Sequence, residues 1–280
     1  MHNFILSAFA DEINPSLSTQ ISVLKKYGIN HIEMRGVNGK NITKHTLDQV
    51  KEIKRELDDS GFKVSAVGSP IGKIQITADF APELDLFKHV LEQAKILDTK
   101  YIRMFSFFIP EGKNPADYRD EVMSRMQQYI DAAKGSGLVL LHENEKDIYG
   151  DNAERCLDLF KTLNCDYLKA TFDPANFVQC GVSPFPDAYQ MLKDYIIYYH
   201  IKDARAADGV VMPAGYGDGG LPQLIDELKN ISFNGFLSFE PHLGDFTGFA
   251  ELENGKAYAN KPASGESLFD VAYTALKRFI

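Results

Sequence analysis

VLLHENE, at residues 139–145, is a short apolar run that ends abruptly in ionisable side chains. A strand that runs through a protein core and delivers acids at one end has this composition. Three later stretches repeat the pattern, and they end on Asp173 (after residues 167–172), His200 (after residues 195–199) and Glu240 (after residues 236–239). Four consecutive strands ending on Glu, Asp, His and Glu predict a metal site at one rim of a parallel barrel.

Predicted strands and helices alternate along the whole chain. The strands are predicted at residues 4–9, 31–34, 64–68, 101–105, 139–145, 167–172, 195–199 and 236–239. The first helix is expected to open at Asn14, as the capping residue before Pro15, and to end at Gly28. The other helices are predicted at residues 47–60, 82–97, 115–135, 152–163, 184–193, 221–230 and 266–279.

This alternation predicts an α/β fold, a single-domain (β/α)8 TIM barrel covering residues 1–280. Strict strand–helix alternation implies a parallel sheet, and eight units imply that the sheet closes on itself. A doubly wound open sheet is the alternative, but the glycine-rich dinucleotide-binding motif that would follow its first strand is absent. In barrels the chemistry lies at the carboxyl ends of the strands.

The composition of the chain limits the classes of partner that we expect it to bind. The chain has 280 residues, 44% of them hydrophobic, and a formal net charge of -9. The absence of a basic stripe argues against a nucleic-acid partner, and the lack of a long apolar run argues against a membrane span. No signal peptide is visible at the start, and the three cysteines lack metal-site spacing, so they are expected to be free thiols in a cytoplasmic protein.

The four strand-end residues are of the types that bind a divalent metal ion. Side chains alternate along a strand, so if Glu143 points into the barrel mouth, Leu141 lies below it and His142 faces the opposite side. Three carboxylates converging in a partly dry mouth would repel one another, and a divalent cation would relieve this conflict. Oxygen donors with one imidazole suit Mn, Mg, Co or Zn. The alternative is that each residue is merely a helix cap or a loop acid.

The order of several short motifs resembles the xylose isomerase-like TIM-barrel family, which includes sugar and sugar phosphate isomerases and epimerases, inosose dehydratase and relatives. The motifs are FADE at 9–12, HIE at 31–33, HENE at 142–145, FDPAN at 172–176, HIKD at 200–203, PAGYGD at 213–218 and SFEPH at 238–242. The resemblance implies one divalent metal held by Glu143, Asp173, His200 and Glu240. It also implies that the two glutamates exchange protons with substrate carbon.

The sequence departs from the epimerase branch at two positions. Asn176 stands where the epimerases have a substrate-binding His, and Glu145 stands where many relatives have a His. Both residues are therefore predicted to contact substrate, as are Arg205, Lys202 and His242. Each of the last three has an alternative: a solvated loop Arg, a salt bridge to a rim acid, and a loop cap, respectively.

Three further charged residues have a predicted role. Arg103 and Glu33 lie within strands and are expected to pair across the barrel, because a buried charge needs a partner. Lys73, in the loop after the third predicted strand, could bind a phosphate. A loop at residues 244–265 could serve as a pocket lid or as an arm in a homo-oligomer interface.

The predicted function is a metal-dependent isomerase or epimerase acting on a small carbohydrate, a sugar phosphate or a polyol. The metal would chelate a hydroxyl and a carbonyl oxygen, and proton removal would give an enediolate. A lyase of the same family, either a dehydratase or a C-glycoside-cleaving enzyme, uses the same intermediate. Alternatives of other classes are a non-catalytic sugar-binding barrel and a DNA-repair endonuclease. The endonuclease would need more His ligands and a basic face.

Overall fold

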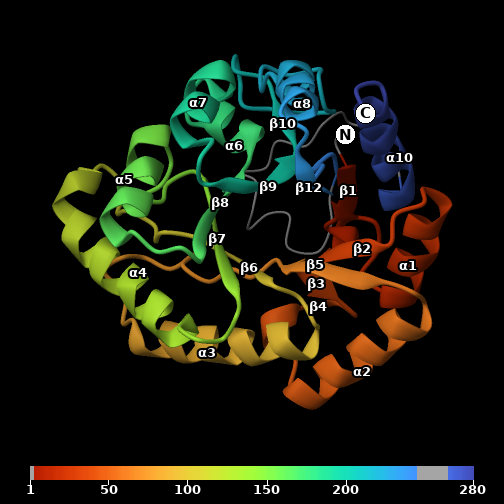
Figure 1. Ribbon diagram of the computed structural model, residues 1–280, viewed down its shortest axis with the longest axis horizontal. Helices are drawn as coiled ribbons and strands as arrows, with labels where there is room; N and C mark the ends of the chain where they lie inside the picture. Colours follow the sequence, from red (N-terminus) through yellow and green to blue (C-terminus); the bar gives the residue numbers. More distant parts are fainter. Residues whose placement is uncertain (1–2, 245–263) are drawn as a thin grey trace.

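The computed structural model describes residues 3–244 and 264–280, and its centre is a ring of eight parallel strands (Figure 1). The strands lie in the order β1-β12-β9-β8-β7-β6-β5-β2, and β1 contacts β2, so the sheet is a nearly closed barrel. Their bounds are β1 Asn3–Ala8, β2 His31–Met34, β5 Lys63–Val67, β6 Tyr101–Met104, β7 Val139–Glu143, β8 Leu168–Phe172, β9 Ile196–Ile201 and β12 Asn234–Phe239. The predicted TIM barrel is confirmed. The predicted lid or interface arm at residues 244–265 lies, apart from its ends, outside the described residues.

Helices surround this ring and bury its outer face (Figure 1). They are α1 Leu17–Lys26, α2 Leu47–Asp59, α3 Ala81–Ile96, α4 Arg119–Ala133, α5 Ala153–Leu163, α6 Pro174–Gln179, α7 Tyr189–Leu192, α8 Leu221–Asn230 and α10 Gly265–Lys277. The predicted start of the first helix is wrong: Ser16 is the N-cap, and the Asn14 side chain accepts a hydrogen bond from the Ser16 backbone N–H. The six-residue α6, which is too short to show a helical period, was not predicted.

Side chains alternate across the barrel wall as predicted. Leu141 packs with Ala66 and Tyr198 in a small cluster separate from the main core. His142 lies on the opposite face of β7, where its Nε2 atom is 2.9 Å from the Ser106 Oγ atom. Burial lowers the pKa of His142 to about 3. His142 is therefore a structural residue of the outer layer, and Glu143 next to it faces the barrel mouth.

Two small antiparallel ribbons that were not predicted decorate the barrel. The β3–β4 ribbon pairs Gly36–Val37 with Lys40–Asn41. Its turn residues, Asn38 and Gly39, have φ angles of 50° and 76°, the left-handed values that a tight two-residue hairpin requires. The β10–β11 ribbon pairs Asp203–Ala204 with Val211–Met212 in the long loop after β9.

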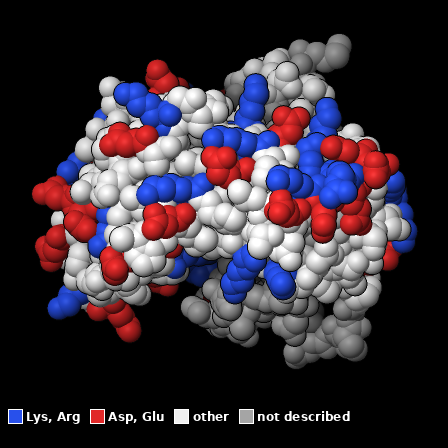
Figure 2. Space-filling model, turned by 90° about the horizontal axis from the view of Figure 1, so that it is seen from below, with Lys and Arg blue, Asp and Glu red and all other residues white. Residues whose placement is uncertain are grey.

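Positive and negative side chains are interspersed on the face formed by α2 and α3 (Figure 2). Several are ion pairs within one helix: Lys51–Asp48, Lys54–Asp58, Lys88–Asp85 and Lys95–Glu92. On this face the described residues therefore form no basic stripe of the kind that neutralises a phosphate backbone. None of the helices in the described ranges has the length and apolar character needed to cross a bilayer.

Candidate metal centre

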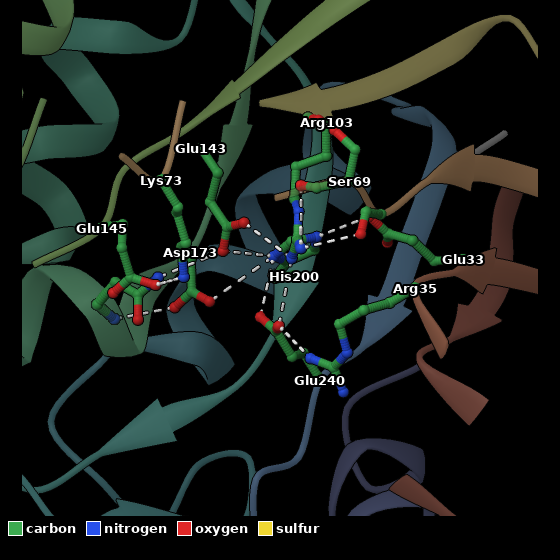
Figure 3. Close-up of polar contacts among 12 residues, drawn as sticks. Glu33, Arg35, Ser69, Lys73, Arg103, Glu143, Glu145, Asp173, His200 and Glu240 are labelled. Carbon is green, nitrogen blue, oxygen red and sulfur yellow. Dashed lines mark hydrogen bonds and ion pairs between the residues drawn. The ribbon is translucent and has the colours of Figure 1, made fainter. Parts of the chain in front are cut away.

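Four predicted ligands meet at the carboxyl ends of their strands (Figure 3). Glu143 ends β7, Asp173 follows β8 as the N-cap of α6, His200 lies near the end of β9, and Glu240 follows β12. One donor atom from each lies within 4.8 Å of all the others, and all four side chains are buried. We call these four residues the ligand cluster.

His200 is oriented by carboxylates on both of its ring nitrogens. Nδ1 lies 2.9 Å from Glu143 Oε1, 3.2 Å from Glu240 Oε2 and 3.7 Å from Asp173 Oδ2. Nε2 lies 3.3 Å from Glu33 Oε1 on the other side of the ring. If Nε2 carries the proton that Glu33 accepts, Nδ1 is left as a lone-pair donor facing the three carboxylates.

Glu33 is itself held by a chain of buried hydroxyls inside the barrel. The Tyr198 hydroxyl donates to Glu33 Oε2 at 2.9 Å. Ser65 Oγ lies 2.9 Å from the Tyr198 oxygen and 2.6 Å from Ser7 Oγ. The expected Glu33–Arg103 pair is therefore wrong: Glu33 contacts His200 instead, while Arg103 contacts Glu143 and Glu240.

The protein supplies its own cations to the ligand cluster. Arg103 Nη1 lies 3.2 Å from Glu143 Oε2 and 3.5 Å from Glu240 Oε1. Lys202 Nζ lies 3.1 Å from Asp173 Oδ2 and 3.4 Å from Glu240 Oε2. These two buried cations, which the sequence argument did not include, also relieve the repulsion between the carboxylates.

These contacts set the protonation of the cluster in the structure. Burial favours the neutral form of Asp173 and raises its pKa, although Lys202 opposes the shift. Burial also acts to raise the pKa of Glu240, but Lys202, His200 and His242 together lower it well below its usual range. Burial acts to lower the pKa of His200, and the surrounding carboxylates raise it well above its usual range. Glu240 is therefore a carboxylate at neutral pH.

Arg35, directly after β2, connects the cluster to the loop after β1. Its guanidinium donates to Asp11 at 2.8 and 3.1 Å and to Glu12 at 3.2 Å. It also lies 3.1 Å from Glu240 Oε1, and the His242 ring nitrogen Nε2 lies 3.3 Å from Arg35 Nη1. Barrel closure between β1, β2 and β12 creates this network.

Phe9 supports both arginines and the histidine. The Arg35 and Arg103 guanidinium carbons lie 4.5 and 4.9 Å from the centre of its ring, and His200 meets it edge-on at 5.2 Å. A Cβ on Gly68 would fall 2.6 Å from this ring, so only glycine leaves room for it there. The aromatic face thereby stabilises two buried cations at the cluster.

The donor set fits a divalent metal ion. Glu143 Oε2 and Asp173 Oδ2 are buried and accept no well-directed hydrogen bond within the described ranges, although Arg103 and Lys202 lie near them. Three carboxylates with one imidazole form a hard, oxygen-rich set suited to ions such as Mn²⁺, Mg²⁺, Co²⁺ or Zn²⁺. The ligand cluster can therefore hold one divalent ion, and within the described ranges it is the one His/Cys/Asp/Glu group that can.

Four of the five predicted substrate contacts lie at or near the cluster. Lys202 and His242 contact Glu240 directly. The Asn176 side-chain nitrogen lies 3.3 Å from Glu143 Oε1 and donates to a backbone carbonyl at 2.9 Å. Glu145 pairs with Lys73 at 2.8 Å. Burial would raise the pKa of Glu145, but neighbouring lysines, Lys73 foremost, lower it to about 2.

Arg205 is not brought to the cluster. Its side chain is 48% exposed and pairs with Asp208, three residues further along the same loop, at 2.6 Å. In the structure Arg205 is thus a solvated loop arginine, as the alternative interpretation had it.

Five charged residues of the site were not predicted to belong to it: Asp11, Glu12, Glu33, Arg35 and Arg103. Each lies within or just after a predicted strand. A charged residue in an otherwise apolar strand is a signal of a barrel rim, and it could have identified them.

A cavity of about 430 Å³ opens beside the cluster, and Arg35 and Arg103 form the boundary between the two. Its position at the carboxyl ends of β2, β5 and β6 makes it the natural entry for a small molecule.

Fold and site together define a parallel barrel with a buried carboxylate–histidine centre of the kind that binds metal. The family model described as xylose isomerase-like TIM barrel matches residues 21–261, so the chain belongs to that family. The predicted family is confirmed.

Named relatives include enzymes of two classes. A 3-dehydroshikimate dehydratase from Bacillus anthracis is 22% identical over 185 residues, which are 65% of this chain and 64% of that protein. The match thus spans just under two thirds of that relative. A D-psicose 3-epimerase from Clostridium cellulolyticum H10, solved with D-tagatose, superposes with a TM-score of 0.75 at 14% identity, covering 98% of each chain. The IOLI protein with a bound zinc atom gives 0.71 at 17% identity, covering 99% of each chain.

Proposed function

We propose that this protein is a divalent-metal-dependent isomerase or epimerase of a small carbohydrate that bears a hydroxyl next to a carbonyl. The observation that carries the proposal is the ligand cluster, in which Glu143 at the end of β7 and Glu240 after β12 both contact Nδ1 of His200. The strand order places two strands, β8 and β9, between them, so they approach a ligand from different directions. The similarity in fold to a D-psicose 3-epimerase supports the reaction type.

In this proposal the metal, when bound, acts as a Lewis acid on the substrate oxygens. One glutamate carboxylate breaks the C–H bond and takes the proton, and the electron pair of that bond moves toward the carbonyl to form an enediolate. The other glutamate, which enters this step protonated, gives its proton to the opposite face of the same carbon and so inverts it. In an isomerisation the proton returns instead to the neighbouring carbon, and the hydroxyl proton passes to the former carbonyl oxygen, so the carbonyl moves. Arg103 holds positive charge beside both glutamates and Lys202 beside Glu240, and both cations stabilise the developing negative charge.

A lyase is the second candidate, because a 3-dehydroshikimate dehydratase is among the relatives that match in sequence. The same proton removal would be followed by loss of a hydroxyl from the carbon next to the enediolate. The electron pair of the enediolate forms the new carbon–carbon double bond, and the hydroxyl takes up the proton held by the glutamate and leaves as water. The two candidates share every residue named above and differ only in the fate of the enediolate.

The test is solvent deuterium exchange into ketoses, keto-polyols and their phosphates with the metal-loaded protein. We expect exchange at one carbon, and we expect Glu143→Gln and Glu240→Gln to lower its rate by at least about a hundredfold, the usual contribution of a positioned base. Glu83→Gln is the matched control, since Glu83 is a buried glutamate outside the cluster that accepts from the Gly72 N–H.

The products separate the candidates. Conversion to an isomer or epimer supports the first, and release of water with a new carbon–carbon double bond supports the lyase. Deuterium exchange that persists in both Gln variants would rule out the two-glutamate mechanism. Stoichiometric metal with no exchange on the whole panel would favour a non-catalytic binding protein.

A further inference from the structure

The cavity beside the ligand cluster is lined by five basic side chains: Arg35, Lys40, Lys44, Lys73 and Arg103. Asp11 is its single acidic lining residue, and Arg35 already binds it through two hydrogen bonds. The chain as a whole carries a net charge of -9. The cavity is therefore a local reversal of the overall charge.

Three of these cations already pair with carboxylates of the protein. Arg35 and Arg103 contact the carboxylates of the ligand cluster, and Lys73 pairs with Glu145 at 2.8 Å (Figure 3). The Lys73 ammonium also lies over the Phe105 ring, 4.4 Å from its centre. Their charge is largely balanced, so they do not by themselves call for an anion.

Lys40 and Lys44 differ from the other three. Both are exposed at the cavity, and no carboxylate among the described residues lies within 4.0 Å of either ammonium group. Two such lysines on the wall of one cavity raise the local electrostatic potential there and attract an anion.

The backbone that carries these two lysines is held by a tight turn and by hydrogen bonds from neighbouring side chains. Lys40 opens β4 immediately after the Asn38–Gly39 turn of the hairpin. Lys44 ends the short 3-10 helix Ile42–Lys44, whose first turn is capped by the Asn41 side chain, which accepts from Thr43 N–H at 3.0 Å. The His45 ring further ties this segment to the Val37 carbonyl at 3.1 Å. The hairpin and the short helix that follows it therefore hold the backbone of both lysines in place at the cavity.

We propose that this cavity binds an anionic group of the substrate, a phosphate monoester or a carboxylate, through Lys40 and Lys44. The inference rests on the proposed function for the statement that the ligand is the substrate. Arg103 contacts both the cavity and the glutamates, so an anion held by the lysines places the rest of the molecule towards the ligand cluster. The preferred substrate is thus a sugar phosphate or a sugar acid and not a neutral sugar.

The test begins with binding, which needs no turnover. Metal-loaded protein, freed of unbound metal, is titrated with inorganic phosphate and with a simple carboxylate at constant ionic strength. Lys40→Gln/Lys44→Gln is compared with Lys134→Gln/Lys161→Gln, which removes the same charge from two exposed lysines outside the cavity. We expect the cavity double variant to bind the anion roughly tenfold more weakly, the loss of about one charge-assisted hydrogen bond, and the control double variant to match the wild type.

Anion binding that is equally strong in both double variants would overturn the inference, because the anion would then sit on the metal or elsewhere. In the exchange assay, the cavity double variant should raise KM for phosphorylated or carboxylated substrates about tenfold and leave neutral sugars unchanged. Whichever of the two anions loses more affinity identifies the group.

The inference and the proposed function fail separately. If no compound exchanges deuterium but the lysines govern anion binding, only the proposed function fails. If neutral sugars react best and the lysines have no effect on phosphate or carboxylate, only the anion site fails.

Discussion

His200 shows how one side chain depends on residues far away in the sequence. Its Nδ1 faces three carboxylates, and its Nε2 faces Glu33 at 3.3 Å. A ring rotated by a small angle would point Nδ1 away from the cluster. The hydroxyl of Tyr198 fixes Glu33 in turn, so the orientation of the imidazole is set from inside the barrel.

We therefore expect Glu33→Ala to weaken binding of a divalent ion about 10- to 100-fold, the usual effect of losing the partner of a ligating histidine. Glu33→Gln retains an oxygen that can accept from Nε2 and should fall between the wild type and the Ala variant. Metal titration by calorimetry measures this effect. Glu83→Ala controls for the loss of a buried glutamate, and equal affinities in all four proteins would refute the positioning role.

Among the elements, the glycine-rich loop after β9 owes its composition to Asp203. Its carboxylate accepts hydrogen bonds from the backbone N–H groups of Gly215, Gly217 and Gly219 at 2.9, 3.0 and 2.8 Å. A Cβ on Gly217 would lie 2.4 Å from Asp203 Oδ1, so a larger residue would break the arrangement. The glycines of this loop thus allow its backbone N–H groups to surround the Asp203 carboxylate.

The contact between α4 and α5 should make stability depend on pH. Arg119 donates twice to Asp158 at 2.7 Å, and hydrogen bonds from Arg119, then Tyr149 and Thr162, lower the pKa of Asp158 to about 2 despite some burial. The unfolded pKa, about 3.9, is higher, so the stabilisation is present above about pH 4 and lost as pH falls towards 2.

Asp158→Asn should therefore lower the free energy of unfolding by roughly 1 kcal/mol at pH 7, a value reduced because Arg119 is partly exposed, and by less at pH 3. Denaturant titrations at the two pH values measure the difference. Asp48→Asn, which removes an exposed carboxylate paired with Lys51, is the control and should change little at either pH. A penalty that stays constant with pH would contradict the assignment.

For the whole molecule, the buried ligand cluster couples metal binding to stability. A ligand that binds only the folded state stabilises it by about 2.7 kcal/mol at one hundred times its dissociation constant. For a chain of this length that corresponds to a rise of roughly 5 °C in the thermal midpoint.

Asp173→Asn should abolish most of that rise. Asn caps a helix about as well as Asp, so α6 and the fold should persist while one charged ligand is lost. Thermal unfolding with and without a divalent ion, reversed by a chelator, measures the effect. An equal rise in the variant would place the responsible ion on the acidic surface and not in the cluster.

Sequence alone determined the barrel and the four members of the ligand cluster. Strand and helix periods are local properties, and parallel strands of a closed sheet bring their carboxyl ends to one rim. Glu143, Asp173, His200 and Glu240 could therefore be grouped without knowing any contact.

Only the tertiary structure decided which groups surround that cluster. Arg35 reaches Glu240, Glu33 supports His200, and Lys40 and Lys44 face a cavity, while Arg205 turns back to its own loop. These pairings depend on strand register, on the closure of β1 and β2 against β12, and on a two-residue turn. Such features join residues that lie far apart in the chain, and no local period encodes them.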